Sequence, residues 1–238
     1  MPRPGRPGRI YRAVVAYYSK YPKFHVAVDC IVFAVKEGRL CMLLVKRDFE
    51  PEKGKWSLIG GFTRATESVD AAAKRVLREL TGLKNVYMQQ VGAFGDIDRD
   101  PGERVVSVAY FALLNYDDVD HAAVEESGAK WVEVDEIPPL GFDHPRMIVK
   151  AREEMRRRIF SEPLVFRLLP EMFTLTQVQN LVEAVVGEPL DKRNFRKRLC
   201  DNPCIAATES FDKSLSRRGA RLYRYLTPVE TGNVKFKI

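Results

Sequence analysis

The stretch that most constrains the fold is Gly60–Leu83, "GGFTRATESVDAAAKRVLRELTGL". A pair of glycines precedes a loop, and the loop leads into a segment with the composition of a helix. Asp70 lies in the first turn of this segment, and Gly82 is placed to end it. We therefore predict a helix over Ser68–Thr81 that follows a short strand and the glycine pair.

The segments on either side of this helix have the character of strands. Runs rich in Val, Ile and aromatic residues, separated by turn-forming residues, are typical of hairpins. A second helix is predicted over Pro145–Phe160, where a proline begins a segment with apolar residues spaced three and four apart. The predicted strands cover residues 24–35, 40–47, 86–94, 104–114 and 129–138. Antiparallel hairpins combined with two helices indicate an α/β sandwich, not a doubly wound parallel sheet.

The formal net charge of +7 is distributed unevenly along the 238 residues. Residues 1–23 contain six Lys or Arg and no acidic residue, so we expect residues 1–22 to form a basic flexible tail. Residues 24–160 contain 20 basic and 23 acidic residues, whereas residues 161–238 contain 13 basic and nine acidic residues. An acidic centre flanked by basic ends suggests that the ends contact a polyanion.

Residues 161–238 have the pattern of a winged helix-turn-helix. Two helices are predicted over Thr176–Val186 and Asp191–Cys200, and two short strands flank a polar loop as in a wing. Phe195 and Leu199 are one helical turn apart, so they face the core and direct the polar side outward. In such modules the second helix enters the major groove, although a solubilising helix with a charged exterior is the alternative. The predicted DNA-binding residues are Lys192, Arg193, Asn194, Arg196, Lys197, Arg198, Lys213, Arg217, Arg218 and Arg221.

Other kinds of site find little support in the sequence. No apolar run approaches the length of about 18 residues that a membrane-spanning helix requires. The N-terminal residues lack the apolar region of a signal peptide. Cys200 and Cys204 lie four residues apart, but none of the three histidines is near them in the sequence. We therefore expect reduced thiols in a cytoplasmic protein, with no bound metal and no cofactor.

Gly61–Leu83 resembles the Nudix box, in which glutamates on one helix bind Mg²⁺ or Mn²⁺ for the hydrolysis of a diphosphate. The matching residues are Gly61, Glu67, Arg75, Leu77, Glu79, Gly82 and Leu83. Val76 and Leu80 stand at positions where the family has glutamates. The resemblance therefore implies the Nudix fold but leaves the metal site incomplete.

These two substitutions leave a single carboxylate, Glu79, on the helix face where the family has three. Because Mg²⁺ gives up its waters reluctantly, a single ligand would hold it weakly. We therefore expect no catalytic residue and no efficient hydrolysis, unless Asp98 or Glu103 supplies the missing acid. A hydrolase cleft without its metal can still bind a small effector. The predicted ligand-binding residues are Asp29, Arg47 and Glu67, each of which also has a purely structural interpretation.

After the tail, the whole sequence resembles the Nudix-related transcriptional regulators, which join a non-hydrolysing Nudix domain to a winged helix-turn-helix. The segments that carry the resemblance are "WSLIGGF", "ESVDAAAKRVLRELTGL", "VGAFGDIDRDPGERVVSVAY", "FDHPRM" and "GEPLDKRNFRKRL". The resemblance implies a Nudix α/β/α sandwich over residues 23–160 and a small winged domain over residues 161–238. It also implies a homodimer on palindromic, double-stranded operator DNA, with the effector weakening the affinity for DNA.

Two branches of this family differ in their effector. One branch senses ADP-ribose and controls NAD metabolism, and the other senses L-arabinose and controls pentose utilisation. The sequence is most similar to the L-arabinose branch, which predicts a sugar-responsive regulator of carbohydrate metabolism. The alternatives are the same architecture sensing ADP-ribose, and an active nucleoside-diphosphate hydrolase whose C-terminal unit serves only dimerisation.

Overall fold

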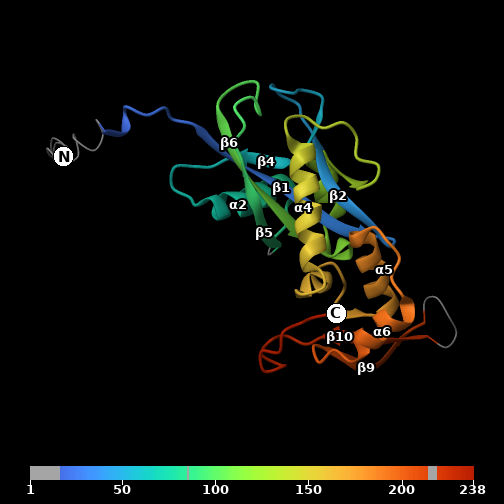
Figure 1. The fold of residues 1–238 in the computed structure, drawn as a ribbon. Helices are drawn as coiled ribbons and strands as arrows, with labels where there is room; N and C mark the ends of the chain where they lie inside the picture. The colour runs from blue at the N-terminus through green and yellow to red at the C-terminus, as the bar shows by residue number, and fades with distance from the viewer. Residues whose placement is uncertain (1–16, 85, 214–218) are drawn as a thin grey trace, which may run out of the picture.

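The computed structural model describes residues 17–84, 86–213 and 219–238, and a large mixed sheet organises the first part of them (Figure 1). Its strands are β1 (His25–Lys36), β2 (Arg39–Lys46), β3 (Trp56–Ser57), β4 (Ile59–Phe62), β5 (Tyr87–Phe94), β6 (Val105–Leu113) and β7 (Ala129–Glu133). The order across the sheet is β3-β2-β1-β6-β5, with β4 paired to β1 and β7 paired to β2. Strand β1 is parallel to β6 and antiparallel to β2 and β4, so it is the central strand.

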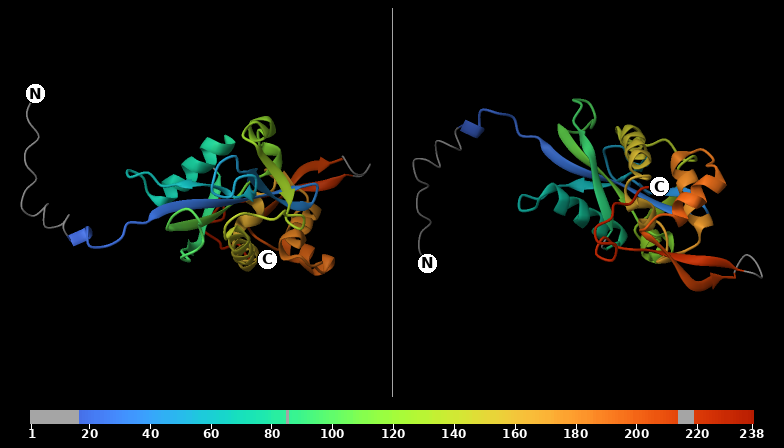
Figure 2. Two further views of the ribbon diagram at one scale, coloured as in Figure 1. Left: turned by 90° about the horizontal axis from the view of Figure 1, so that it is seen from above. Right: turned by 60° about the horizontal axis from the view of Figure 1, so that its bottom comes forward.

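Helices cover both faces of this sheet. α2 (Val69–Thr81) and the short α3 (His121–Glu126) lie on one face, and α4 (His144–Arg158) lies on the other, as the view from above shows (Figure 2). α2 begins one residue after the predicted start, because Ser68 is its cap: the Ser68 hydroxyl oxygen accepts the Ala71 amide at 3.1 Å. The described connecting segments include the 3-10 helices η1 (Tyr116–Asp118) and η2 (Pro163–Arg167). No described helix has the length and apolar character needed to cross a bilayer.

Alternation along β1 divides its side chains between two apolar cores, because successive residues of a strand face opposite sides. Val28 and Val32 belong to the core beneath α2. Ile31 and Phe33 belong to the core beneath α4. Asp29 is two residues before Ile31, so its side chain points to the same side of β1. It therefore lies on the α4 face of the sheet, and α2 covers the other face.

The residues after α4 form a smaller unit with the predicted winged helix-turn-helix arrangement. Its elements are α5 (Leu175–Val186), α6 (Lys192–Cys200) and a three-stranded sheet of β8 (Met172–Phe173), β10 (Ala220–Tyr225) and β9 (Ile205–Asp212). Thr174 and Gln177 form a capping box at the start of α5, and Gly187 ends the helix in the left-handed conformation with φ 80°. The predicted domain boundary after residue 160 falls between α4 and η2 and stays a prediction.

The two units share one apolar core. Met155 and Ile159, at the end of α4, are buried in the same cluster as Val182 of α5. The C-terminal residue also returns to this junction, where the Ile238 amide donates to the Phe160 carbonyl at 2.9 Å. The end of α4 is therefore packed together with the winged unit.

Candidate functional site

Arginines hold the remaining carboxylates of the box on the α2 face of the sheet. The Arg75 guanidinium lies 2.5 Å from Glu67 and 2.9 Å from Glu79. Arg64 donates its backbone amide to Glu67 at 2.7 Å and its guanidinium to Glu79 at 3.2 Å. Hydrogen bonds from Arg75 lower the pKa of Glu67 from its ordinary value of 4.5 to about 2, and Arg75 also lowers the pKa of Glu79. Both carboxylates are therefore ionised at neutral pH and already paired.

Val76, at the place of a metal-binding glutamate, is a core residue. Its side chain is buried with Ala72 and Leu77 beneath α2. A Cβ atom on Gly61 would stand 3.0 Å from Val76 Cγ2, so β4 crosses directly over this side chain. In the described part of the chain, no group of three or more His, Cys, Asp or Glu side chains could hold a metal. The side chain of Leu80 lies outside that part, and the residues that are described do not fit the Mg²⁺ of a Nudix box.

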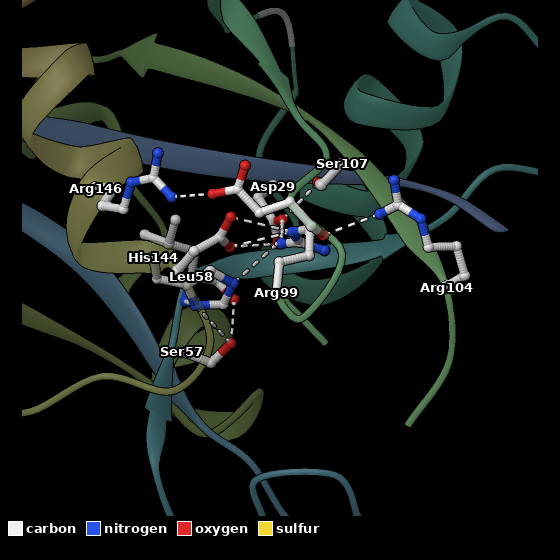
Figure 3. A network of polar contacts seen from close by, with 10 residues as sticks. Asp29, Ser57, Leu58, Arg99, Arg104, Ser107, His144 and Arg146 are labelled. Atoms are coloured by element: carbon white, nitrogen blue, oxygen red, sulfur yellow. Dashed lines mark hydrogen bonds and ion pairs between the residues drawn. The ribbon is translucent and has the colours of Figure 1, made fainter. Parts of the chain in front are cut away.

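A second polar cluster lies on the α4 face, and it is buried (Figure 3). Asp29 is 6% exposed and accepts a hydrogen bond from the Ser107 hydroxyl at 2.6 Å. The other partners of Asp29 are the Arg99 guanidinium at 3.5 Å and the His144 ring at 3.4 Å. Arg99 reaches in from the β5–β6 loop, and its guanidinium also contacts Asp143 at 2.8 Å. Each buried charge therefore has a partner, as burial of a charge requires.

The His144 imidazole fixes this cluster to the segment between β3 and β4. Its Nδ1 accepts the Leu58 amide at 3.2 Å, so the ring proton lies on Nε2, which faces Asp29. Burial opposes the ionisation of Asp29. The contacts with His144, Ser107 and Arg99 outweigh burial, so the pKa of Asp29 lies below its ordinary value. The carboxylate is therefore ionised inside the domain.

The sheet separates the two clusters. A Cβ atom on Gly60 would stand 2.3 Å from a carboxylate oxygen of Asp29, whereas the next glycine, Gly61, faces Val76. Neighbouring residues of β4 thus face opposite sides of the sheet. The structure therefore does not bring Asp29 and Glu67 together in one cleft. Their assignment as ligand contacts stays a prediction.

Arg47, the third predicted ligand contact, lies at the end of β2 between two aromatic rings. Its guanidinium carbon is 4.3 Å from the centroid of the Phe49 ring and 5.0 Å from that of Phe142. Its Nε donates to the Pro51 carbonyl at 2.8 Å. The Phe142 ring lies 5.2 Å from the His144 ring, so Arg47 borders the buried cluster. A role for Arg47 in ligand binding stays a prediction.

A groove of about 570 Å³ lies beside the buried cluster, between the end of β5 and α4. Arg146 forms an ion pair with Asp96 at its edge. The Lys150 ammonium lies 5.5 Å from the centroid of the Phe94 ring, and Val149 adds apolar surface that is 56% exposed. Cations, a carboxylate and apolar surface in one groove suit a polar organic ligand that carries charge.

The sequence analysis did not single out Arg99, Asp143 or His144, although they lie within two of the quoted segments. An arginine among aspartates in a turn-rich loop has no periodicity that shows which way it points. One signal was present. Asp29 is a carboxylate in an apolar strand, and a buried carboxylate needs a cationic partner or hydrogen-bond donors elsewhere in the chain.

Helix α6 presents most of the predicted DNA-binding residues. Phe195 and Leu199 are buried, as predicted. The exposed residues of the helix include Lys192, Arg193, Asn194, Lys197 and Arg198. Arg196 differs, because it is half-buried and its guanidinium donates to the Thr176 hydroxyl at 2.7 Å. Arg196 therefore braces α6 against α5, a structural role that the sequence analysis did not assign to it.

Strands β9 and β10 form the wing. Lys213 and Arg221 are exposed, and the Arg221 guanidinium lies 5.7 Å from the centroid of the Phe211 ring. Arg217 and Arg218 lie outside the described residues. Of the predicted contacts in the wing, Lys213 and Arg221 thus add two exposed cations to those of α6.

Comparison with known proteins matches both units of the fold. Residues 23–151 match the NUDIX domain family, and residues 165–225 match the NrtR DNA-binding winged helix domain. The chain belongs to the NrtR family of Nudix-domain transcriptional regulators. The Nudix α/β domain is the first unit of this NrtR-type regulator, and the winged helix is the second.

Members of the NrtR family align with nearly the whole chain. The ADPR responsive transcriptional repressor NtrR of Acinetobacter baylyi is 33% identical over 220 residues, which cover 90% of this chain and 88% of that protein. Shewanella oneidensis NrtR complexed with a 27mer DNA has a TM-score of 0.78 and 30% identity, covering 89% of this chain and 97% of that chain.

A third NrtR match concerns the first unit alone. The NUDIX domain of Shewanella oneidensis NrtR complexed with ADP ribose has a TM-score of 0.51 and 31% identity, covering 60% of this chain and 97% of that chain. Two of the three relatives are described with ADP-ribose and none with L-arabinose. The comparisons therefore support the NrtR family and give no support to the predicted L-arabinose branch or to a role in carbohydrate metabolism.

Proposed function

We propose that this NrtR-type regulator is a transcriptional repressor that binds ADP-ribose in its Nudix domain, and that ADP-ribose weakens its binding to operator DNA. The observation that carries the proposal is the 33% identity, across both units, with a repressor described as ADPR responsive. The alternative effector from the sequence analysis thus replaces L-arabinose as the better-supported one.

The groove between β5 and α4 suits ADP-ribose chemically. Arg146 and Lys150 supply cations for a diphosphate. Asp96 and Glu153 supply carboxylates that accept hydrogen bonds from ribose hydroxyls. Another groove, beside α2, has no carboxylate among its lining residues, whose charged members are Lys74, Arg75, Arg78 and Lys84. A small uncharged sugar such as L-arabinose carries no anionic group with which Arg146 and Lys150 could pair.

Thermal unfolding distinguishes the two effectors. ADP-ribose should raise the Tm and L-arabinose should leave it unchanged, because only a ligand that prefers the native state stabilises it, by about 2.7 kcal/mol at a hundred times its Kd. Replacing Arg146 and Lys150 by Ala together should abolish the shift. Arg157→Ala is the control, since Arg157 lies on the same helix and pairs with Glu154. A shift with L-arabinose alone would overturn the proposal.

We also propose that the Nudix domain does not hydrolyse ADP-ribose. A cation at Glu79 would have to replace the ion pairs with Arg75 and Arg64, and Val76 offers it no second ligand. Incubation with ADP-ribose and Mg²⁺ or Mn²⁺ should release no AMP above a protein-free blank. Metal-dependent AMP release would make the active hydrolase the better interpretation.

Helix α6 is proposed to enter the major groove of the operator. Arg193 and Lys197 are four residues apart, so they share one exposed face. Replacing either by Ala should weaken binding to a labelled duplex taken from upstream of the gene that encodes this chain. The slope of log Kd against log salt should fall by about 0.9 for each phosphate that the variant no longer neutralises. Lys74→Ala, on the exposed side of α2, is the control and should leave the slope unchanged. An unchanged slope in both Arg193→Ala and Lys197→Ala would rule out α6 as the helix that enters the major groove.

A homodimer on a palindromic operator is part of this proposal. Two-fold symmetry in the protein is matched by two half-sites in the DNA. Sedimentation of the complex should give two chains on each duplex. One chain bound to a duplex that carries both half-sites would contradict the dimer and leave the assignment of the reading helix intact.

A further inference from the structure

We propose that α4 couples the Nudix domain to the DNA-reading helix α6, and that Arg156 is the positioning residue through which a change at the start of α4 reaches α6. The biological use of this coupling rests on the proposed function. Its physical test requires neither ADP-ribose nor DNA.

The start of α4 is built into the buried cluster of the Nudix domain. Asp143 immediately precedes the helix and pairs with Arg99. Arg99 also contacts Asp29 (Figure 3). His144, the first residue of the helix, accepts the Leu58 amide and faces Asp29. The groove proposed for the effector is lined by the next turns of the same helix. Any rearrangement around Arg99 therefore acts on the first turn of α4.

Helix α4 carries such a change along its whole length. It has 15 residues, which corresponds to a rod of about 22 Å. A buried stripe of Met147, Ile148, Ala151 and Met155 holds one side of the rod against the core. Because packed interiors deform little, a displacement at one end is transmitted to the other and is not absorbed along the way.

Arg156, in the last turn of α4, makes a directional contact with α5. Its Nε donates to the Val185 carbonyl at 3.0 Å. This carbonyl belongs to the last turn of α5, where carbonyl groups have no partner within the helix. The guanidinium also lies against Gly187, where an added Cβ would stand 3.1 Å from Nη2. A cation at this end of α5 also complements the helix dipole.

The last turn of α5 in turn holds the segment that leads into α6. The Glu183 carboxylate accepts the Gln179 side-chain amide at 2.9 Å and the Leu190 backbone amide at 2.9 Å. Asp191 then caps α6 through the Asn194 amide at 2.7 Å. A chain of specific contacts therefore joins Arg156 to the first turn of the reading helix. α4 and α5 also contribute side chains to one apolar core, and packing of that kind is less directional than a hydrogen bond.

A double-mutant cycle read by amide hydrogen exchange tests the coupling in the full-length protein. Asp143→Asn keeps the shape of the side chain and removes the charge that pairs with Arg99. In the otherwise wild-type chain, this variant should speed exchange in the last turn of α5 and the first turn of α6 several-fold. In an Arg156→Ala background the same change should add nothing, because coupled positions are non-additive.

Two further variants control the cycle. Arg157→Ala, one residue along α4, should leave the effect of Asp143→Asn intact. Arg156→Lys retains a donor for the Val185 carbonyl and should restore part of the response. Peptides from α2, which packs on the opposite face of the sheet, report any global loss of stability, and that loss is subtracted. The proposal is overturned if Asp143→Asn leaves exchange in α5 and α6 unchanged, or raises it equally with and without Arg156.

A second measurement connects the coupling to regulation. The ratio of operator Kd with and without saturating ADP-ribose should fall by about fivefold or more in Arg156→Ala, since allosteric coupling usually spans that range. ADP-ribose should still raise the Tm of this variant. If this ratio equals one in the wild-type protein, the proposed function fails. The hydrogen-exchange cycle still tests whether α4 is coupled to α6.

Discussion

The two carboxylate clusters of the Nudix domain lie on opposite faces of one sheet and contain the same kinds of ion pair. They differ in their access to water. In the cluster on the α2 face, the Glu79 side chain is 43% exposed and those of Glu67 and Arg75 are 13% exposed, whereas the side chains of Asp29 and Arg99 are 9% and 4% exposed. Exposed pairs gain little because water and salt screen them. A buried charge that loses its partner is costly. The ion pairs of Glu67 and Glu79 therefore hold the loop before α2 in place, while the cluster around Arg99 contributes to the stability of the whole domain.

The same difference bears on function. On the α2 face, Arg75 and Arg64 pair with Glu79, and Val76 packs in the apolar core. The cluster on the other face is continuous with α4 and so with the winged unit. The sensor function that we propose therefore depends on the face away from the box.

Removing Arg99 should have the largest effect. Arg99→Ala leaves Asp29 and Asp143 buried without their cation, and breaking a buried pair in this way costs about 3–5 kcal/mol. Urea denaturation at neutral pH measures the loss in the free energy of unfolding. Arg64→Ala, in the exposed cluster, is the matched control and should leave the midpoint nearly unchanged. Equal losses of unfolding free energy in Arg99→Ala and Arg64→Ala would show that the buried and the exposed cluster contribute equally to stability.

Gly60→Ala should have the next largest effect. The new Cβ would stand 2.3 Å from Asp29 and 3.1 Å from the Val28 carbonyl, so the carboxylate or the backbone must move. Overpacking of a filled core costs about 1–3 kcal/mol. The control is Gly61→Ala, which meets only a methyl group of Val76 at 3.0 Å and should cost less. A larger loss of stability for Gly61→Ala than for Gly60→Ala would contradict the tighter packing predicted on the Asp29 side of β4.

The elements of the fold could be predicted from sequence where their signals are local. The bounds of α2 were predicted to within one residue, and its end followed from Gly82, because a cap depends on residues next to the helix. Likewise, the burial of Phe195 and Leu199 followed from their helical spacing. Such features need no knowledge of the rest of the chain.

The site could be predicted only in part, because its contacts join distant segments. Asp29 and Arg99 are 70 positions apart, and the sequence does not show that one loop arginine reaches one strand carboxylate. The face of the sheet on which Asp29 lies follows from alternation, but only once the burial of its neighbours is known. Discrimination between effectors depends on a few hydrogen bonds, which leave no pattern in the sequence.

Glu67→Gln should change the pH dependence of stability. The pKa of Glu67 is lowered in the folded protein from 4.5 to about 2. Its stabilising contribution is therefore fully present above pH 4.5 and is lost as the pH falls toward 2. In Glu67→Gln this part of the loss is absent, so the urea midpoint should fall less steeply between those pH values. Identical slopes would show that the ion pair with Arg75 contributes nothing to folding.

Glu79→Gln should have the smallest effect of the four. Glu79 is exposed and shares Arg75 with Glu67, so Gln leaves the better-buried pair in place. The urea midpoint at neutral pH should match the wild type, and added salt should remove any residual difference, because screening already weakens an exposed pair. Mg²⁺ should shift the Tm of neither protein. A Mg²⁺-dependent stabilisation that is lost in Glu79→Gln would show that the box still binds metal, and would place a functional site on each face of the sheet.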